Sequence, residues 1–244
     1  MSEILKTGAI VLGKLDYGDT SKIGSFFTEK YGKISAIIKG ARSPKSKIGS
    51  IVDTLNQIDL VFYKKENRDL QFISQADLKN NFRKIKDDFE KLKHASAIIE
   101  LVKYTTIEYE EHPKLYRGLV RILALINDEK ENPKINFVKF FLFLLNEIGF
   151  DLQFKNCVWC GNEFVEDEYV FFNFESGFMC EECSQERLIN MDFPAELFNL
   201  LNCLSYKSKQ FSYNENDLHK LTAFLERYLS YHLPEFKKLK SLSL

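Results

Sequence analysis

The sequence lacks the short motifs by which many enzymes hold a nucleotide or arrange a nucleophile. No G-x-x-x-x-G-K-[ST], G-x-G-x-x-G, G-x-S-x-G or H-E-x-x-H pattern occurs in it. Histidines are few and scattered, at His94, His112, His219 and His232. The acidic pairs at 87–88 and 110–111 are typical of solvated helix faces, and His94 and His219 of ordinary surface or edge positions. We therefore assign no catalytic residue and expect that the protein is not an enzyme.

The chain also lacks a hydrophobic run long enough to span a membrane. Its most apolar stretch, residues 137–150, contains Lys139, Asn146 and Glu147. It is shorter than the roughly 20 residues that a transmembrane helix needs, so a buried core helix is the better interpretation. The first residues do not show the charged start, apolar core and cleavage site of a secretory leader. We expect a cytoplasmic protein with no membrane partner.

Cysteine is scarce, and the five cysteines form an odd number, which argues against a pure disulfide framework. Four of them follow the spacing C-x2-C-x19-C-x2-C, as Cys157, Cys160, Cys180 and Cys183. A two-residue gap lets both thiolates of one turn face the same ion, and two such turns complete a tetrahedral shell. The spacing therefore predicts one Zn²⁺ per chain. Four thiolates leave no open position, so we expect the metal to be structural.

Two unrelated or redox-active cysteine pairs are the alternative interpretation. A thioredoxin-like C-x-x-C belongs in a βαβ context, which this part of the sequence does not show. Gly161 and Gly177 flank the two turns and supply the backbone freedom that they need, and residues 168–178 between them are typical of a short hairpin. The fifth cysteine, Cys203, lies on the apolar face of a predicted helix and is expected to be a small buried hydrophobe.

Residues 1–80 have the period-two pattern of strands, and no internal repeat or low-complexity tract occurs in the chain. Ile34, Ala36 and Ile38 alternate along one such strand. We expect five strands: one at 7–13, two within 22–40 joined by a turn at 29–32, one at 56–65 and one at 69–76. Five short strands with few helices between them predict a small closed barrel, for which the five-stranded OB fold is the candidate.

From residue 83 the apolar spacing changes to that of amphipathic helices. Helices are expected at 84–104, 112–127, 132–150, 194–206 and 216–233. The third of these has Pro133 in its first turn and Gly149 just past its end. We therefore predict an α+β protein with four parts: an OB-fold domain at 1–80, a helical domain beginning at 81–150, an inserted zinc module at 151–190, and C-terminal helices at 191–244 that complete the helical domain.

The net charge of −1 conceals a strong asymmetry along the chain. Residues 22–47 carry seven Lys and Arg residues and one acid, whereas residues 151–200 carry two bases and eleven acids, a net of −9. The basic end favours a polyanionic partner. Four thiolates around one Zn²⁺ add about −2 to the acidic part, which would repel phosphate. We interpret the zinc module as a staple between helices, with protein binding as an added role.

The densest basic cluster lies in residues 37–50, IIKGARSPKSKIGS. We expect an exposed barrel loop there, shaped by Gly40 and Pro44. Its cations would neutralise phosphates while aromatic rings stack on bases, and a merely solvated lysine-rich loop is the alternative. The candidate nucleic-acid-binding residues are Lys22, Lys33, Lys39, Arg42, Lys45 and Lys47.

The segment KGARSPKSK at 39–47, the C-x-x-C pairs and the ending YHLPEFKKLKSLSL at 231–244 occur together in this order. In these features and in its length the chain resembles the family of the bacterial recombination mediator protein RecO. Within that resemblance, Lys39, Arg42, Lys45 and Lys47 match the DNA-binding loop. The family tends to have two glycines before the second cysteine pair, where this chain has Gly177 and Phe178.

The resemblance implies a DNA repair and recombination protein without nuclease or ATPase activity. Such a protein binds single- and double-stranded DNA, anneals complementary strands, works with RecR and engages the C-terminal tail of single-stranded-DNA-binding protein (SSB). It helps to load RecA onto SSB-coated strands, so RecA and RecF are indirect partners. Two other functions stay open on the residues alone: a zinc-stabilised adaptor for proteins, and an RNA-binding barrel.

Overall fold

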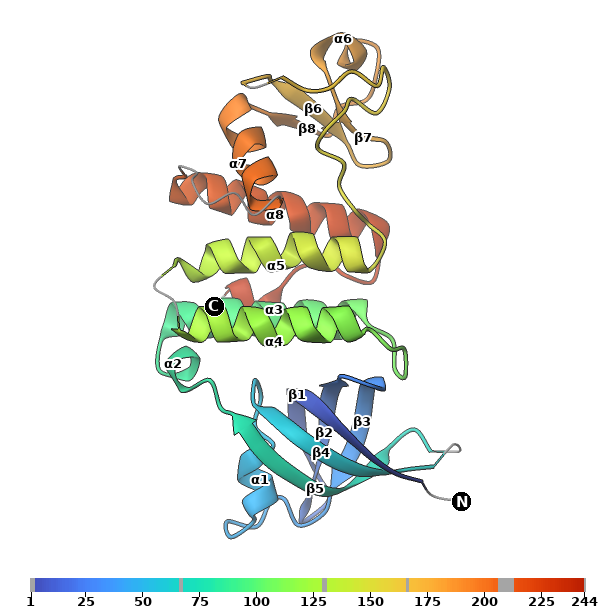
Figure 1. Cartoon of the computed structure of the whole chain (residues 1–244), viewed down its shortest axis with the longest axis vertical. Helices are drawn as coiled ribbons and strands as arrows, with labels where there is room; N and C mark the ends of the chain where they lie inside the picture. The colour runs from blue at the N-terminus through green and yellow to red at the C-terminus, as the bar shows by residue number, and fades with distance from the viewer. Residues whose placement is uncertain (1–2, 66–67, 129–130, 166, 206–212, 244) are drawn as a thin grey trace. The chain divides into compact units, whose positions relative to one another are not determined.

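The computed structural model describes residues 3–65, 68–128, 131–165, 167–205 and 213–243. The chain forms two compact units, residues 1–133 together with 240–244, and residues 134–239. The architecture is α+β, as predicted, because a five-stranded sheet precedes the helices (Figure 1). No helix in the described part of the chain combines the length and the apolar character that crossing a membrane requires.

Five strands form a closed barrel at the start of the first unit. They are β1 (Glu3–Tyr17), β2 (Ser21–Thr28), β3 (Gly32–Ile38), β4 (Gln57–Lys64) and β5 (Gln71–Asn80). Their order around the barrel is β1-β2-β3-β5-β4. The first strand is longer than the predicted 7–13, and it pairs with both β2 and β4, with a register shift between Val11 and Gly13 that bends it. A short parallel pairing of β3 with β5 completes the ring.

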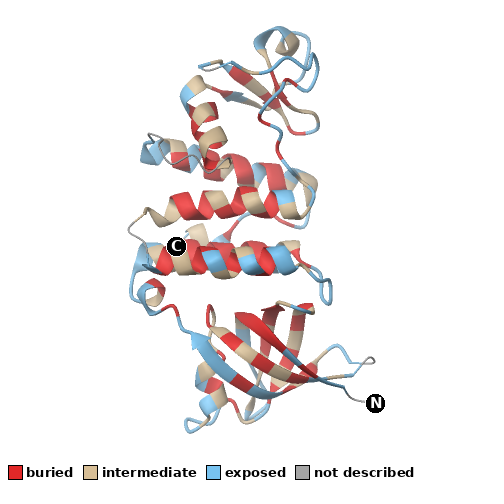
Figure 2. Ribbon diagram, viewed as in Figure 1, coloured by how far each residue is buried: buried red, intermediate tan, exposed pale blue. Residues whose placement is uncertain are grey.

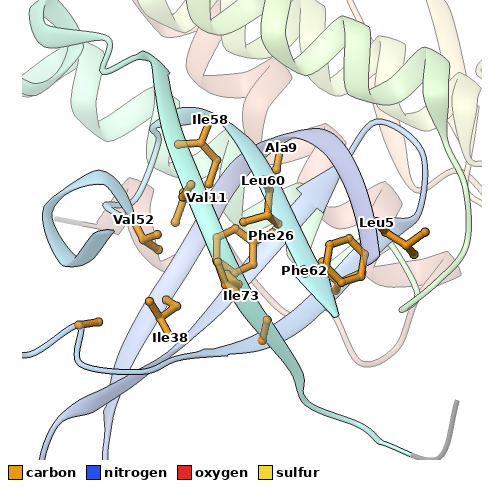
Figure 3. Close-up of a cluster of buried hydrophobic side chains, with 14 residues drawn as sticks. Leu5, Ala9, Val11, Phe26, Ile38, Val52, Ile58, Leu60, Phe62 and Ile73 are labelled. Carbon is orange, nitrogen blue, oxygen red and sulfur yellow. The ribbon is translucent and has the colours of Figure 1, made fainter. Parts of the chain in front are cut away.

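Side chains from all five strands fill the barrel core (Figure 3), and Figure 2 marks the buried residues of each strand. In β3 and β4 every second residue is buried, whereas in β1 residues 7–12 are all buried. Along β3, Ile34, Ala36 and Ile38 are fully buried while the residues between them are half-buried, which confirms the predicted alternation. Phe26 and Phe62 lie among them in the interior (Figure 3). Burying a side chain of this size contributes about 1.5–3 kcal/mol, so the alternation determines which face of each strand points inward.

A short helix that was not predicted, α1 (Lys47–Ile51), begins within the basic cluster at residues 37–50. The side chain of Ser46 caps it by accepting a hydrogen bond from the backbone N–H of Gly49 at 3.2 Å. Gly49 is buried, and a Cβ atom there would lie 2.1 Å from the carbonyl oxygen of Ala41. The helix therefore packs directly against the backbone of the basic segment.

Three helices and a C-terminal turn complete the first unit: α2 (Arg83–Lys86), α3 (Phe89–Thr105), α4 (Pro113–Asp128) and η1 (Lys240–Ser243). The prediction of a single helix at 84–104 is wrong, because two helices, α2 and α3, cover these residues. The side chain of Asp88 accepts a hydrogen bond from the backbone N–H of Lys91 and so begins α3. Phe89 in the first turn of α3 is 63% exposed, whereas His94, which was expected at the surface or an edge, is buried. The carboxylate of Glu100 accepts the backbone N–H groups of Lys240 and Ser241, which joins η1 to α3.

The second unit contains α5 (Pro133–Glu147), β6 (Val170–Asn173), β7 (Gly177–Met179), α6 (Glu181–Ser184), β8 (Met191–Phe193), α7 (Ala195–Ser205) and α8 (Glu215–His232). The predicted hairpin is β6 with β7, but β8, which adds a third strand beside β6, was not predicted. The chain leaves α5 through Gly149 at a φ of 86°, as expected of a helix end. Cys203 of α7 is half-buried, less than predicted, and Tyr206, the last residue of that expected helix, lies outside the described residues.

Aromatic rings hold the three-stranded sheet of the second unit against α7 and α8. The ring of Phe178 in β7 lies 4.6 Å from that of Phe172 and 5.1 Å from those of Phe193 and Phe198, measured between centroids. Phe224 of α8 meets Phe172 at 4.9 Å with an interplanar angle of 89°. Edge-to-face contacts of this kind add to the stabilisation from burial alone. The cysteine-bearing turns are thus attached to a packed core.

Candidate functional site

The basic loop, residues 39–47, is held to the barrel by backbone hydrogen bonds. Gly40 adopts a φ of 68°, a left-handed conformation that favours glycine, and the Ser43 N–H donates back to its carbonyl at 3.2 Å. The N–H of Arg42 donates to the carbonyl of Thr20 at 3.0 Å. This bond pins the basic loop to the turn between β1 and β2, so its conformation is set without a ligand.

Arg42 strengthens the same connection with its side chain. Its guanidinium donates to the carbonyl of Gly18 and lies 3.5 Å from the carboxylate of Asp16. Both partners belong to the end of β1 and the turn after it. Much of the hydrogen-bonding capacity of Arg42 is therefore used inside the protein, although its side chain is 40% exposed.

Lys33 is engaged at the end of α3. Its ammonium donates to the carbonyl of Lys103 at 2.9 Å and to that of Thr106. Burial lowers the pKa of Lys33; the Glu108 carboxylate opposes this effect and the charge of Lys103 adds to it. A cation that satisfies the last carbonyls of a helix stabilises that end. The structure thus places Lys33 at the connection between β3 and α3.

The remaining four predicted cations are available to solvent. Lys39 lies with its Nζ atom 4.8 Å from the centroid of the Phe72 ring. Lys45 and Lys47 are exposed, and Lys22 is half-buried opposite Ile38, the residue before the basic loop. Across the described residues, no hydrogen bond or ion pair engages the ammonium groups of Lys22, Lys45 and Lys47. Cations without an internal partner at one edge of a barrel are suited to neutralising phosphates.

Sequence reasoning missed the aromatic partner of the basic loop. We assigned Phe72 only to a strand, although Lys39 lies over its ring and the guanidinium carbon of Arg68 lies 5.2 Å from its centroid. The signal was present in the alternation of β5, because Ile73 is buried in the core and its neighbour Phe72 must point outward. That Phe72 lies beside the basic loop follows only from the pairing of β3 with β5.

The four predicted metal ligands come together in the second unit. The sulfur atoms of Cys157, Cys160, Cys180 and Cys183 all lie within 4.8 Å of one another. Those of Cys160 and Cys180 are 3.8 Å apart. A tetrahedron with metal–sulfur bonds of about 2.3 Å has sulfur–sulfur distances of about 3.8 Å, so the arrangement fits one tetrahedral ion. Gly161 follows the first cysteine pair with a φ of 75°, which confirms its predicted role, whereas Gly177, with a φ of 110°, serves the hairpin turn between β6 and β7.

The thiols of this group differ in how easily they ionise. Burial opposes ionisation of Cys157, but backbone N–H groups of Cys160, Cys180 and Trp159 lower its pKa to about 6. Desolvation, followed by the neighbouring sulfurs, raises the pKa of Cys183 to about 12. Hydrogen bonds from the backbone, with a smaller one from the Cys160 side chain, therefore stabilise one thiolate. A full set of thiolates requires a cation among them, and a divalent metal has the charge to supply that need.

Comparisons with known proteins cover nearly the whole chain. Residues 1–82 match the family model described as Recombination protein O N terminal, and residues 86–243 match that described as Recombination protein O C terminal. A DNA repair protein RecO of Chloroherpeton thalassium is 30% identical over 98% of this chain and 96% of its own. That of Prosthecochloris aestuarii is 32% identical over 83% of this chain and 80% of its own. That of Clostridium perfringens strain 13 is 30% identical over 91% of each.

Proposed function

This chain belongs to the recombination protein O family, and we propose that it is a recombination mediator in DNA repair that binds single- and double-stranded DNA and anneals complementary strands. The observation that carries this proposal is the basic loop with Lys22 beside it. Its free ammonium groups would neutralise phosphates of two strands and reduce the repulsion between them. Annealing requires no bond to be broken, so the proposal includes no catalytic residue.

We assign the barrel to the OB-fold class. The strand order and the pairing of β1 with both β2 and β4 support this assignment. We keep the four predicted parts, with the DNA-binding domain at 1–80, the helical domain at 81–150 and 191–244, and the zinc module at 151–190. The family boundary between residues 82 and 86 supports the first limit.

The six predicted DNA-binding residues divide into two kinds under this proposal. Lys22, Lys39, Lys45 and Lys47 would contact phosphates. Arg42 and Lys33 would act mainly by holding the surface in shape, since their side chains already bind carbonyl groups of the protein. Arg42 retains an exposed side and would add charge to the phosphate path.

The metal that best fits the four thiols is Zn²⁺, one per chain, in a structural role. Cys157, Cys160, Cys180 and Cys183 would supply all four ligands, and their sulfur spacing supports a tetrahedral ion. When bound, the ion would neutralise the thiolates and add its binding free energy to the stability of the fold.

The partners that we propose follow from the family. They are RecR and the C-terminal tail of SSB directly, and RecF and RecA indirectly. Pairing of SSB-coated strands requires the coating protein to be displaced or rearranged, which gives the helical parts of the chain a role in binding proteins. A role on chromosomal DNA would place the protein in the cytoplasm.

A salt titration tests the basic loop. Lys22, Lys45 and Lys47 are changed to alanine together, and binding to a fluorescent single strand and to a duplex is measured at several salt concentrations. Each phosphate contact contributes about 0.7 to the slope of log K against log salt for single strands, so the slope should flatten by about 2. Lys114, Arg117 and Arg121, which are exposed on α4, give a control variant with the same change in charge.

Unchanged affinity and slope for the Lys22, Lys45 and Lys47 variant would reject the basic loop as the DNA site. Two further measurements test the alternative functions, an RNA-binding barrel and an adaptor for proteins. A preference for RNA over DNA of the same sequence would favour an RNA-binding barrel. Failure to anneal complementary strands coated with SSB would favour an adaptor that joins proteins.

A further inference from the structure

An outward-facing row of apolar side chains crosses the barrel beside the basic loop. The strand register places Ile37 of β3 opposite Phe72 of β5, and Phe72 opposite Tyr63 of β4. Tyr63 in turn lies opposite Ile4 of β1. We call these four residues the outer row. Their sequence neighbours are buried in the barrel core, which turns the outer row toward solvent: Leu5, Ile38, Phe62 and Ile73.

The outer row leaves large apolar groups in water. Ile4 is 63% exposed and Tyr63 is 41% exposed, while Ile37 and Phe72 are half-buried. Single exposed hydrophobic residues are ordinary on protein surfaces, but a continuous apolar strip bordered by charge indicates a binding surface. Neighbouring strands are about 4.8 Å apart, so Phe72 and Tyr63 stand side by side.

Two cations border the aromatic part of the outer row. Lys39 reaches Phe72 from the basic loop after β3, and Arg68 reaches it from the turn before β5, at 4.8 Å and 5.2 Å from the ring centroid. No carboxylate pairs with Lys39 or Arg68 among the residues that the structure describes. An aromatic strip with unpaired cations beside it complements a ligand that has flat apolar faces and a negatively charged backbone.

We propose that the outer row binds unpaired bases of single-stranded DNA. This inference rests on the proposed function, because it names the form of DNA that the barrel holds. The faces of bases would stack on Tyr63, and on Phe72 once Lys39 and Arg68, which lie over its ring in the free protein, move onto the phosphates. Bases within a duplex have their faces covered by the neighbouring pairs, so only a single strand can use this contact.

Stacking on the outer row is compatible with annealing. It engages the faces of the bases and leaves their Watson–Crick edges free to meet a complementary strand. The basic loop contacts only phosphates and therefore serves both forms of DNA. The two surfaces share Lys39, which lies in the basic loop and above Phe72.

The test is a variant in which Tyr63 and Phe72 are both changed to leucine. This change keeps charge and apolar character but removes the stacking faces. Binding to a fluorescent single strand and to a hairpin duplex is measured at one salt concentration, with thermal unfolding to verify the fold. Stacking of one base is worth roughly fivefold to a hundredfold in affinity, so single-strand binding should fall by at least that lower factor while duplex binding stays unchanged. Phe89→Leu on α3 is the control, because Phe89 is 63% exposed in the same unit.

An equal loss for both forms of DNA would overturn the inference, since it would assign the rings to the fold or to backbone binding. No loss for either form would also overturn it, and would leave the outer row as a surface for another molecule. The proposed function fails separately, through the variant of Lys22, Lys45 and Lys47. If that variant loses both forms while the leucine variant loses neither, the basic loop stands and only the outer row is rejected.

Discussion

The basic loop and the four-cysteine module are both short turns shaped by glycines, but they arrange charge in opposite ways. In the basic loop, Lys45 and Lys47 point to solvent, and backbone bonds such as that of Arg42 to Thr20 hold the turn. In the module, the ionisable sulfurs of Cys157 and its three partners point at one another within 4.8 Å. The basic loop is therefore held in shape by the protein's own hydrogen bonds, whereas the four sulfurs form a group that could hold a metal ion.

Because of this difference, we expect substitutions in the basic loop to affect DNA binding and substitutions of the cysteines to affect the stability of the fold. Under the proposed function, removing a charge from the basic loop takes away a contact with DNA and should leave the fold intact. Under the same proposal, removing one of the four sulfurs takes away a Zn²⁺ ligand and should destabilise the turns that carry them. Phe178 shows how tightly the module is tied to the fold, because its ring is fully buried among Phe172, Phe193 and Phe198.

The largest effect is expected for Cys157→Ser, which removes a ligand from the module. The variant should lose its metal and at least about 3 kcal/mol of unfolding free energy, because metal binding energy in such sites is folding energy. Metal analysis and chemical denaturation measure the two quantities. Cys203→Ser in α7 is the control and should keep the metal. Wild-type protein that contains no zinc would contradict the four-thiolate site.

A smaller effect is expected for Gly49→Ala, which tests whether α1 positions the basic loop. The new Cβ atom would meet the Ala41 carbonyl oxygen, 2.1 Å away, so helix and loop must move apart. Overpacking of this kind costs about 1–3 kcal/mol. DNA affinity should fall with stability. Gly149→Ala is the comparison, because Gly149 has a φ of 86° with no atom within 4 Å of an added Cβ and lies away from the basic loop in the sequence, so it tests backbone strain alone. Equal behaviour of both variants would reject a positioning role for α1.

Lys33→Met and Lys45→Met are compared to distinguish a lysine that stabilises the fold from a lysine that binds DNA. Lys33→Met removes the hydrogen bonds to Lys103 and Thr106 and should cost about 1 kcal/mol of stability with little change in DNA affinity. Lys45→Met should show the reverse. Urea denaturation and fluorescence anisotropy measure the two effects. A loss of DNA affinity for Lys33→Met as large as that for Lys45→Met would assign Lys33 to the DNA surface.

The smallest effect is expected for the dependence of stability on pH that Asp53 contributes. Asp53 follows α1 and accepts hydrogen bonds from Lys14 at 2.7 Å and Lys86 at 2.9 Å. Burial alone would raise the pKa of Asp53. The hydrogen bonds and charges of Lys14 and Lys86 together outweigh this effect, so the pKa of Asp53 lies below its ordinary value. The stabilisation is therefore present above the unfolded pKa of about 3.9 and is lost as the pH falls through the folded value.

The measurement is urea denaturation of wild type and Asp53→Asn at neutral pH and in acid. The wild type should be more stable at neutral pH by under about 1 kcal/mol, since the Asp53 side chain is 43% exposed, and the difference should shrink in acid. A difference that is constant with pH would show that the charge of Asp53 does not matter.

Local patterns in the sequence determined much of this protein. The alternation of Ile34, Ala36 and Ile38 predicted a strand and its buried face, because burial follows the period of the strand. The two-residue gaps between cysteines predicted that four sulfurs would come together, because each gap allows both thiolates of a turn to face one point. In both cases the decisive residues are neighbours in the sequence.

Only the tertiary structure decided what several of the cations do. Lys33 belongs to a basic segment by sequence, yet it binds the carbonyl of Lys103, 70 residues away. Lys39 lies above Phe72 because β3 pairs with β5, and Arg42 bonds to Gly18 because its loop folds onto the turn after β1. A charge in a sequence does not by itself say what surrounds it in the folded protein. Whether its partner is a carbonyl, a ring or a phosphate depends on which distant segment folds against it.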